Sequence, residues 1–206
     1  LNCNRSLKLH PDFAPTVNNL GLLMRDRENI DSAIVLFRKA ARGFNPDIAA
    51  AEDVGQAWLN LADAFDRHRM LDSTAAAYAQ AMKAAPEWSR PYAQAAAFYA
   101  RHQGYRKADS LFIEAADRGD LTASDAFNWG LALIEGGRPH HGRGLMLRAL
   151  SMDRDLYQAY YCIGLAHLQE ESPRDSVLHY LEEALEINPD FEPAKKLYET
   201  VLSDDG

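Results

Sequence analysis

Small residues recur along the chain at a regular interval and mark the same local pattern each time. Successive copies lie 34 positions apart, at Ala62, Ala96, Gly130 and Gly164, and a further copy lies upstream at Gly21. An apolar residue directly precedes each small residue, and a larger side chain follows three positions later. A fixed period of this length predicts an array of stacked repeats, in which each repeat is one supersecondary unit.

A second apolar pattern follows each small residue after a short break, such as Gln103–Gly104 or Gly136–Pro139. Its members are spaced by four and then three positions, which places them on one face of a helix. These trios are Ala33, Phe37 and Ala40; Thr74, Tyr78 and Ala81; Ala108, Phe112 and Ala115; Gly142, Met146 and Ala149; and Val177, Leu181 and Ala184. Each repeat is therefore predicted to contain two helices joined by a tight turn.

One stretch carries the fullest set of these positions. Its members are Trp58, Leu61, Ala62, Phe65, Thr74, Tyr78, Ala81 and Pro86. With the period of 34, this pattern resembles the tetratricopeptide repeat (TPR) family. The resemblance implies an all-α fold, a right-handed α-solenoid (TPR superhelix) of antiparallel helix pairs. Five full repeats are expected at 14–47, 55–88, 89–122, 123–156 and 157–191, after the end of a truncated repeat at 1–11 and before a C-terminal capping helix at 191–203.

The spacing is irregular in two places. The first interval, from Gly21 to Ala62, is 41 positions, seven more than the period. Seven residues are close to two helical turns, so lengthened helices would keep their apolar faces in register. We therefore expect Ile48–Val54 to extend a helix. In the last repeat, the turn around Glu171–Pro173 carries one extra residue.

Composition narrows the possible functions of the 206-residue chain. Its formal net charge of −8 disfavours sequence-independent nucleic-acid binding, which needs a basic footprint. No apolar run approaches the roughly 20 residues that span a bilayer, so direct membrane insertion is not expected. Cys3 and Cys162 form no metal-binding or disulfide framework. No known arrangement of a nucleophile with a base, of metal ligands or of a phosphate loop is present, so the sequence predicts no enzyme, cofactor or metal.

By the family resemblance, the first helix of each repeat lines a concave surface that can meet a ligand. Three kinds of side chain on these helices are candidates for peptide binding. An amide lies two positions before the small residue at Asn19, Asn60, Gln94 and Asn128; apolar side chains face inward at Phe127, Leu131 and Tyr161; and arginines lie nearby at Arg90 and Arg101. An amide both donates and accepts hydrogen bonds, so it can pair with any peptide unit. Each set also has a structural interpretation: consensus packing for the amides, burial under the next helix for the apolar residues, and solvated charges for the arginines.

The sequence therefore predicts a scaffold that binds a peptide or protein segment in its concave groove. One alternative is a regulatory or substrate-selecting arm of a larger enzyme such as a glycosyltransferase, for which long TPR arms give a family precedent. A second alternative is a self-assembly module, in which exposed repeat ends stack between chains.

Overall fold

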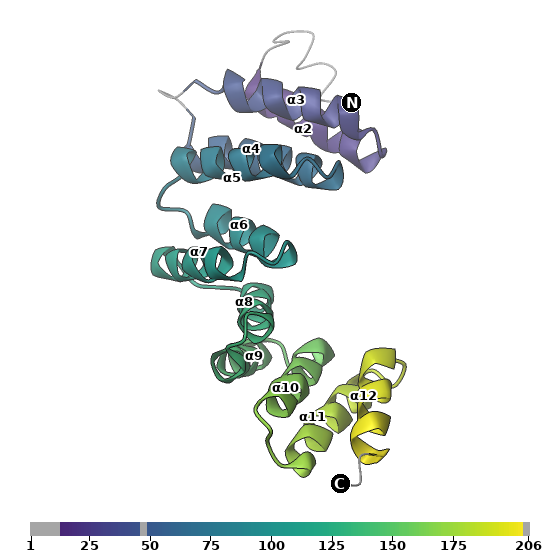
Figure 1. The fold of residues 1–206 in the computed structure, drawn as a ribbon. Helices are drawn as coiled ribbons and strands as arrows, with labels where there is room; N and C mark the ends of the chain where they lie inside the picture. Colours follow the sequence, from purple (N-terminus) through teal and green to yellow (C-terminus); the bar gives the residue numbers. More distant parts are fainter. Residues whose placement is uncertain (1–12, 46–48, 204–206) are drawn as a thin grey trace. The chain divides into compact units, whose positions relative to one another are not determined.

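A computed structural model of the chain describes residues 13–45 and 49–203 (Figure 1). These residues form α-helices joined by turns, and the described ranges contain no strand. The chain divides into two compact units, residues 1–95 and 96–206, with the division inside helix α6. The expected truncated repeat at 1–11 lies outside the described residues.

The first unit holds two consecutive helix pairs and the start of α6. Its helices are α2 (Ala14–Asp26), α3 (Ile30–Gly43), α4 (Ala51–Arg67), α5 (Leu71–Ala84) and α6 (Ser89–Arg101), the last of which continues into the second unit. Helix α2 packs on α3, α3 on α4, and α4 on α5. Val17, Ala40, Ala41 and Ala57 form a buried cluster with Leu36, Phe44 and Trp58 against it, so apolar faces from successive pairs share one core.

The second unit continues the same arrangement. Its helices are α7 (Tyr105–Arg118), α8 (Ala123–Glu135), α9 (Pro139–Met152), α10 (Tyr157–Gln169), α11 (Arg174–Ile187) and α12 (Glu192–Ser203). Each of these helices packs on the next one along the chain. Between α7 and α8, Trp129 stacks on Phe112 with ring centroids 5.7 Å apart, and its indole N–H donates to Asp109 over 2.7 Å. The aromatic side chains thus fill the space between these two helices.

The small residues of the repeat lie where two helices approach most closely. A Cβ atom built on Gly142 would lie 2.6 Å from the carbonyl oxygen of Gly130, and one on Gly130 would lie 2.9 Å from that of Gly142. In the first unit, a Cβ on Gly21 would lie 2.6 Å from the Phe37 ring. Backbone and ring atoms therefore occupy the space that a larger residue would need.

The turns inside the helix pairs share one backbone geometry, which the sequence pattern does not predict. A residue with positive φ ends the first helix each time: Glu28, Arg69, Gln103, Gly137 and Glu171. The next N–H then bonds back across the turn, as from Gly104 to the carbonyl of Tyr99 over 2.8 Å and from Arg138 to that of Leu133 over 2.8 Å. This is the Schellman ending, which usually takes glycine. Only Gly137 is glycine among these five, and a left-handed conformation costs other residues roughly 1–2 kcal/mol.

The structure accounts for both irregularities of spacing. It corrects in part the helix extension that we predicted for the first one. Helix α4 has 17 residues, where α2, α6, α8 and α10 have 13. Its added turn is 51–54, so the expected extension over Ile48–Val54 is wrong for residues 49 and 50, which are not helical. Ala50 is extended at φ −62° and ψ 143°, which ends the preceding connection, and Ile48 lies outside the described residues. In the last pair, the extra residue places Pro173 as the cap before α11.

Two glycines of α9 provide a matched test of the close approach. We expect Gly142→Ala to destabilise the protein by roughly 1–3 kcal/mol, because the new methyl group meets backbone of α8 that cannot move away cheaply. Gly144 lies on the same helix with no atom within 4 Å of a built Cβ. Gly144→Ala should therefore stabilise by about 0.5–1 kcal/mol through helix propensity alone. Urea denaturation followed by circular dichroism measures both changes. Equal destabilisation by the two variants would contradict the assignment.

Candidate functional site

The amides that lie two positions before the small residue, and that are predicted to bind a peptide, have different surroundings in the structure. Asn60 is buried, and its side-chain N–H donates to the Asn18 oxygen over 2.9 Å. Its own oxygen accepts from the Gln56 amide over 2.9 Å. Asn60 therefore joins α2 to α4 and uses hydrogen-bonding groups inside the protein. Asn19, at the equivalent position of α2, is exposed.

Charged side chains beside this amide network pair with one another. Asp63 of α4 lies 3.7 Å from Arg25 of α2 and 3.1 Å from Arg67 on its own helix. These pairs are partly exposed, so each contributes little to stability, typically under about 1 kcal/mol.

The second unit contains a cavity of about 430 Å³ that brings together three of the predicted binding residues. Arg101 comes from the end of α6, and Asn128 and Leu131 come from α8. The other lining residues are Ala97, Ala100, Gln103, Tyr105 and Glu135. We call this cavity the α6–α8 site. It combines amide, cationic, anionic and apolar groups within one concavity.

Asn128 differs from Asn60 in its hydrogen bonding. It is half-buried, and its side chain has no hydrogen-bond partner among residues 13–45 and 49–203. Leu131 lies beside it, one turn further along α8, and packs partly against the core around Ile134 and Met146. The α6–α8 site thus presents one amide able to donate and accept next to an apolar surface.

Tyr105 and Glu135 were not among the predicted residues. Tyr105 begins α7 and Glu135 ends α8, so both lie at helix ends, where the 34-residue pattern carries little information. The pKa of Tyr105 is raised by desolvation first, and then by the charge of Glu135 and a hydrogen bond to it. The phenol is protonated at neutral pH with or without this shift, and it lies near the Glu135 carboxylate in the lining of the site.

The remaining predicted residues lie elsewhere. Phe127 and Tyr161 pack partly against the core cluster that contains Cys162, and Tyr161 meets Phe191 edge-on at 5.3 Å. Burial raises the pKa of the Cys162 thiol to about 12, with a smaller contribution from Glu135, so this thiol is protonated and unreactive. Gln94 is half-buried on α6, and Arg90 lies over the Trp88 ring at 5.8 Å. None of these four predicted residues (Phe127, Tyr161, Gln94, Arg90) lines the α6–α8 site.

A polar cluster joins α9 to α10 in the second unit. His167 stacks on Tyr180 with ring centroids 5.3 Å apart, and its Nδ1 lies 3.1 Å from the Arg143 guanidinium and 3.0 Å from the Ser172 hydroxyl. Arg143 also pairs with Glu170, which lies 3.7 Å from His140. Desolvation lowers the pKa of His167, the Arg143 charge lowers it further, and Glu170 partly opposes both. His167 is therefore a neutral ring at neutral pH.

The described residues contain no group of three or more His, Cys, Asp or Glu side chains placed to hold a metal ion. None of the described helices is both long and apolar enough to cross a membrane. Cys3 lies outside the described residues.

Comparison with known proteins identifies the fold. No model of a known protein family matches the chain. Among solved structures, it is similar to YrrB, a TPR protein with an unusual peptide-binding site, at a TM-score of 0.76 and 15% identity, over 96% of this chain and 97% of that one. It is also similar to the C-terminal part of a TPR repeat-containing protein from Cytophaga hutchinsonii, at a TM-score of 0.75 and 12% identity, over 98% and 82%.

A third similar structure is MamA from Desulfovibrio magneticus RS-1, at a TM-score of 0.74 and 13% identity, over 87% of this chain and 97% of that one. The class is therefore an α-solenoid of antiparallel helix pairs. Within that class, the chain has the tetratricopeptide-repeat fold, which confirms the fold class that the sequence predicts.

A curated human protein is similar in sequence. The chain is 24% identical over 192 residues to protein O-mannosyl-transferase TMTC3 from Homo sapiens. The match covers 89% of this chain but 21% of that protein. The chain thus spans about a fifth of the length of this relative.

The environment of His167 predicts a pH-dependent stability. Because its pKa is lowered on folding, the native state binds fewer protons than the unfolded state between that lowered value and the ordinary value of 6.5. We expect the protein to lose stability as pH falls through this window, since protonation places a second cation beside Arg143. His167→Phe keeps the stacking on Tyr180 and should reduce this loss.

Urea midpoints at pH 7.5 and pH 5 measure the effect, with the exposed His141→Ala as a control that retains it. A His167→Phe variant that loses as much stability on acidification as the wild type would contradict the assignment.

Proposed function

We propose that the chain is a protein-interaction scaffold that binds an extended peptide segment at the α6–α8 site. The observation that carries this proposal is Asn128, a half-buried amide at a concave site with no hydrogen-bond partner among the described residues. This amide is partly exposed, so its donor and acceptor are open to a ligand and are not committed to another side chain. A peptide unit of any sequence supplies both the donor and the acceptor that it lacks.

The surroundings of Asn128 favour a peptide over a small polar ligand. Leu131, Ala97 and Ala100 form an apolar surface for a side chain of the bound segment. Arg101 and Glu135 carry opposite charges at the same site, so neither a strongly acidic nor a strongly basic ligand is specified. Backbone pairing with Asn128 and side-chain burial on Leu131 together suit a segment of mixed composition.

The similar structure of YrrB supports this proposal at the level of the fold. YrrB is a TPR protein with an unusual peptide-binding site, and its structure matches over nearly the whole of this chain. Because the identity is only 15%, the binding residues of YrrB cannot be carried over to this chain. We propose the residues of the α6–α8 site in their place.

Selection from a random peptide library on the immobilised chain, followed by fluorescence polarisation with a selected peptide, tests the site. We expect Asn128→Ala and Leu131→Ala each to weaken binding about tenfold, through a lost hydrogen bond and lost apolar contact respectively. The matched control is Leu147→Ala, since Leu147 is an exposed leucine on α9 of the same unit.

Circular dichroism spectra confirm that each variant is folded before its affinity is compared. Selected peptides that bind both α8 variants as tightly as the wild type would show that the α6–α8 site is not the binding surface.

The second candidate function is a regulatory or substrate-selecting arm of a larger enzyme. The observation that favours it is the similarity to protein O-mannosyl-transferase TMTC3, of which this chain covers only 21%. In that case the α6–α8 site would hold the protein substrate while a separate domain transfers the sugar.

The full coding sequence around this chain separates the two functions. A glycosyltransferase domain encoded in the same reading frame is expected for an enzyme arm. A reading frame that encodes helix pairs and no catalytic domain would remove this candidate and leave the scaffold.

A further inference from the structure

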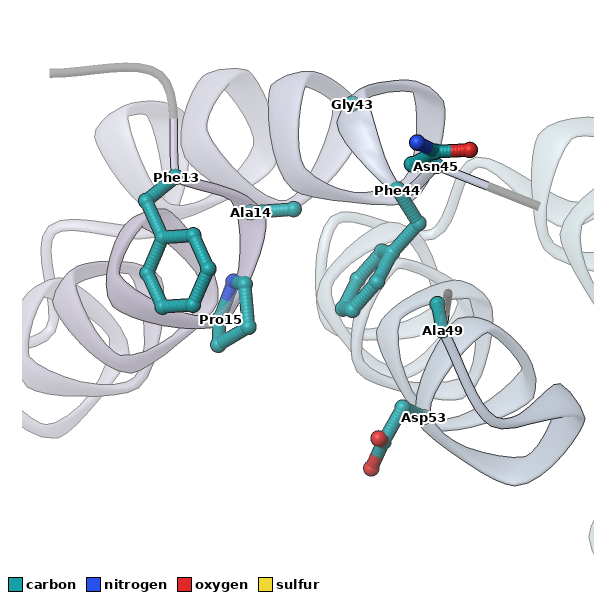
Figure 2. A pocket seen from close by; sticks show the side chains of 8 residues that line it. All are labelled: Phe13, Ala14, Pro15, Gly43, Phe44, Asn45, Ala49 and Asp53. Atoms are coloured by element: carbon teal, nitrogen blue, oxygen red, sulfur yellow. The ribbon is translucent and has the colours of Figure 1, made fainter. Parts of the chain in front are cut away.

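A second cavity, of about 380 Å³, lies in the first unit (Figure 2). Its lining comes from the start of α2, the end of α3 and the start of α4. The residues are Phe13, Ala14, Pro15, Gly43, Phe44, Asn45, Ala49 and Asp53. We call it the Phe13–Phe44 pocket. Its volume is near the lower end of the roughly 300–1,000 Å³ of small-ligand pockets.

Two aromatic rings dominate this pocket. The Phe13 and Phe44 side chains lie on either side of Ala14 and Pro15 (Figure 2). Phe44 is half-buried because it also packs against the core cluster around Val17 and Ala57, whereas Phe13 is 53% exposed. A large aromatic side chain with half its surface in water has no role in the core of this unit. It can therefore serve as a contact surface.

Among the described residues that line the pocket, Asp53 carries the only formal charge. Its side chain makes no ion pair or hydrogen bond with any residue that the structure describes. It is exposed in the first turn of α4, next to Glu52, which does not line the pocket. The Phe13–Phe44 pocket is thus an apolar, aromatic surface with an unpaired carboxylate at its edge.

We propose that the Phe13–Phe44 pocket is a second binding site, which takes an arginine side chain from a basic segment of a partner protein. An arginine carries an apolar stem that packs on aliphatic and aromatic surfaces. Its planar guanidinium stacks on aromatic faces and pairs with a carboxylate through two parallel hydrogen bonds. Phe13 and Phe44 supply the apolar and aromatic surfaces for the stem and the guanidinium plane, and Asp53 supplies the carboxylate.

The charge of the chain is complementary to this occupant. The net charge is −8, and no lysine or arginine is among the described residues that line the pocket, so a basic segment is attracted and an acidic one is repelled. The pocket lies in the first unit, and the α6–α8 site lies in the second. Binding of arginine at the Phe13–Phe44 pocket therefore does not depend on peptide binding at the α6–α8 site.

Nuclear magnetic resonance titration of the full chain labelled with ¹⁵N tests the site with two small probes. N-acetyl-arginine amide carries the proposed side chain, and N-acetyl-norleucine amide carries an uncharged alkyl chain. We expect saturable shifts of the Phe13, Phe44 and Asp53 backbone amides with the arginine probe, and much weaker shifts with the norleucine probe.

Three variants separate the contributions. Asp53→Asn should weaken arginine binding about fivefold, near the upper limit for an exposed ion pair. Phe13→Ala should weaken it similarly without loss of fold, because Phe13 is exposed. Glu52→Gln removes the neighbouring acid outside the pocket and should leave the affinity unchanged.

Either of two results would overturn the proposal. One is an absence of shifts at the pocket, or equal shifts with both probes, which would show that the guanidinium is not recognised. The other is an equal loss of affinity in Asp53→Asn and Glu52→Gln, which would mean that general acidity attracts the probe rather than this carboxylate.

Discussion

The close approach of the two helices in each pair is the constraint on which the rest of the structure depends. Gly130 and Gly142 show it most directly, because each glycine lies against the carbonyl oxygen of the other. A helix pair this tight has room between its helices for only a few side chains, such as Phe37 against Gly21 and Met146 against Gly130, so its other apolar residues lie on the outward faces. Those faces are buried only when the next pair packs on them, and the fold is therefore a stack of repeats.

Packing between repeats explains why several predicted binding residues serve the structure instead. Asn60 bridges α2 and α4, and Tyr161 contacts Phe191 at the start of α12. Each side chain lies on the first helix of a pair and contacts a residue outside its own helix. That contact uses the groups with which it could bind a ligand. Asn128 lines the α6–α8 site and has no hydrogen-bond partner among the described residues, and this difference makes it the strongest candidate for recognition.

The sequence predicts the helix faces well because their cause is local and periodic. Phe37, Phe112 and Leu181 fall at the middle position of the first, third and fifth trios, and all three are fully buried. The turn geometry could not be predicted in the same way. Glu28, Arg69, Gln103 and Glu171 adopt positive φ because the packed helices on both sides require it, although their own preference opposes it. The non-helical residues 49 and 50 have a similar cause, since alanine favours helix but the chain must turn there to enter α4.

Part of the lining of each candidate site lies at helix ends for the same physical reason. Buried residues within the helices are fixed by packing, so they can change little without loss of stability. Gln103 and Tyr105 lie at a turn, and Phe13 and Asp53 lie in or before a first helical turn; there the backbone satisfies its own hydrogen bonds and the side chains are released from the core. A repeat protein can therefore acquire different binding chemistry at successive turns while its stack is unchanged. In this chain, the turn before α7 adjoins an amide and a leucine from the middle of α8, and the start of α2 and of α4 offer two aromatic rings beside a carboxylate.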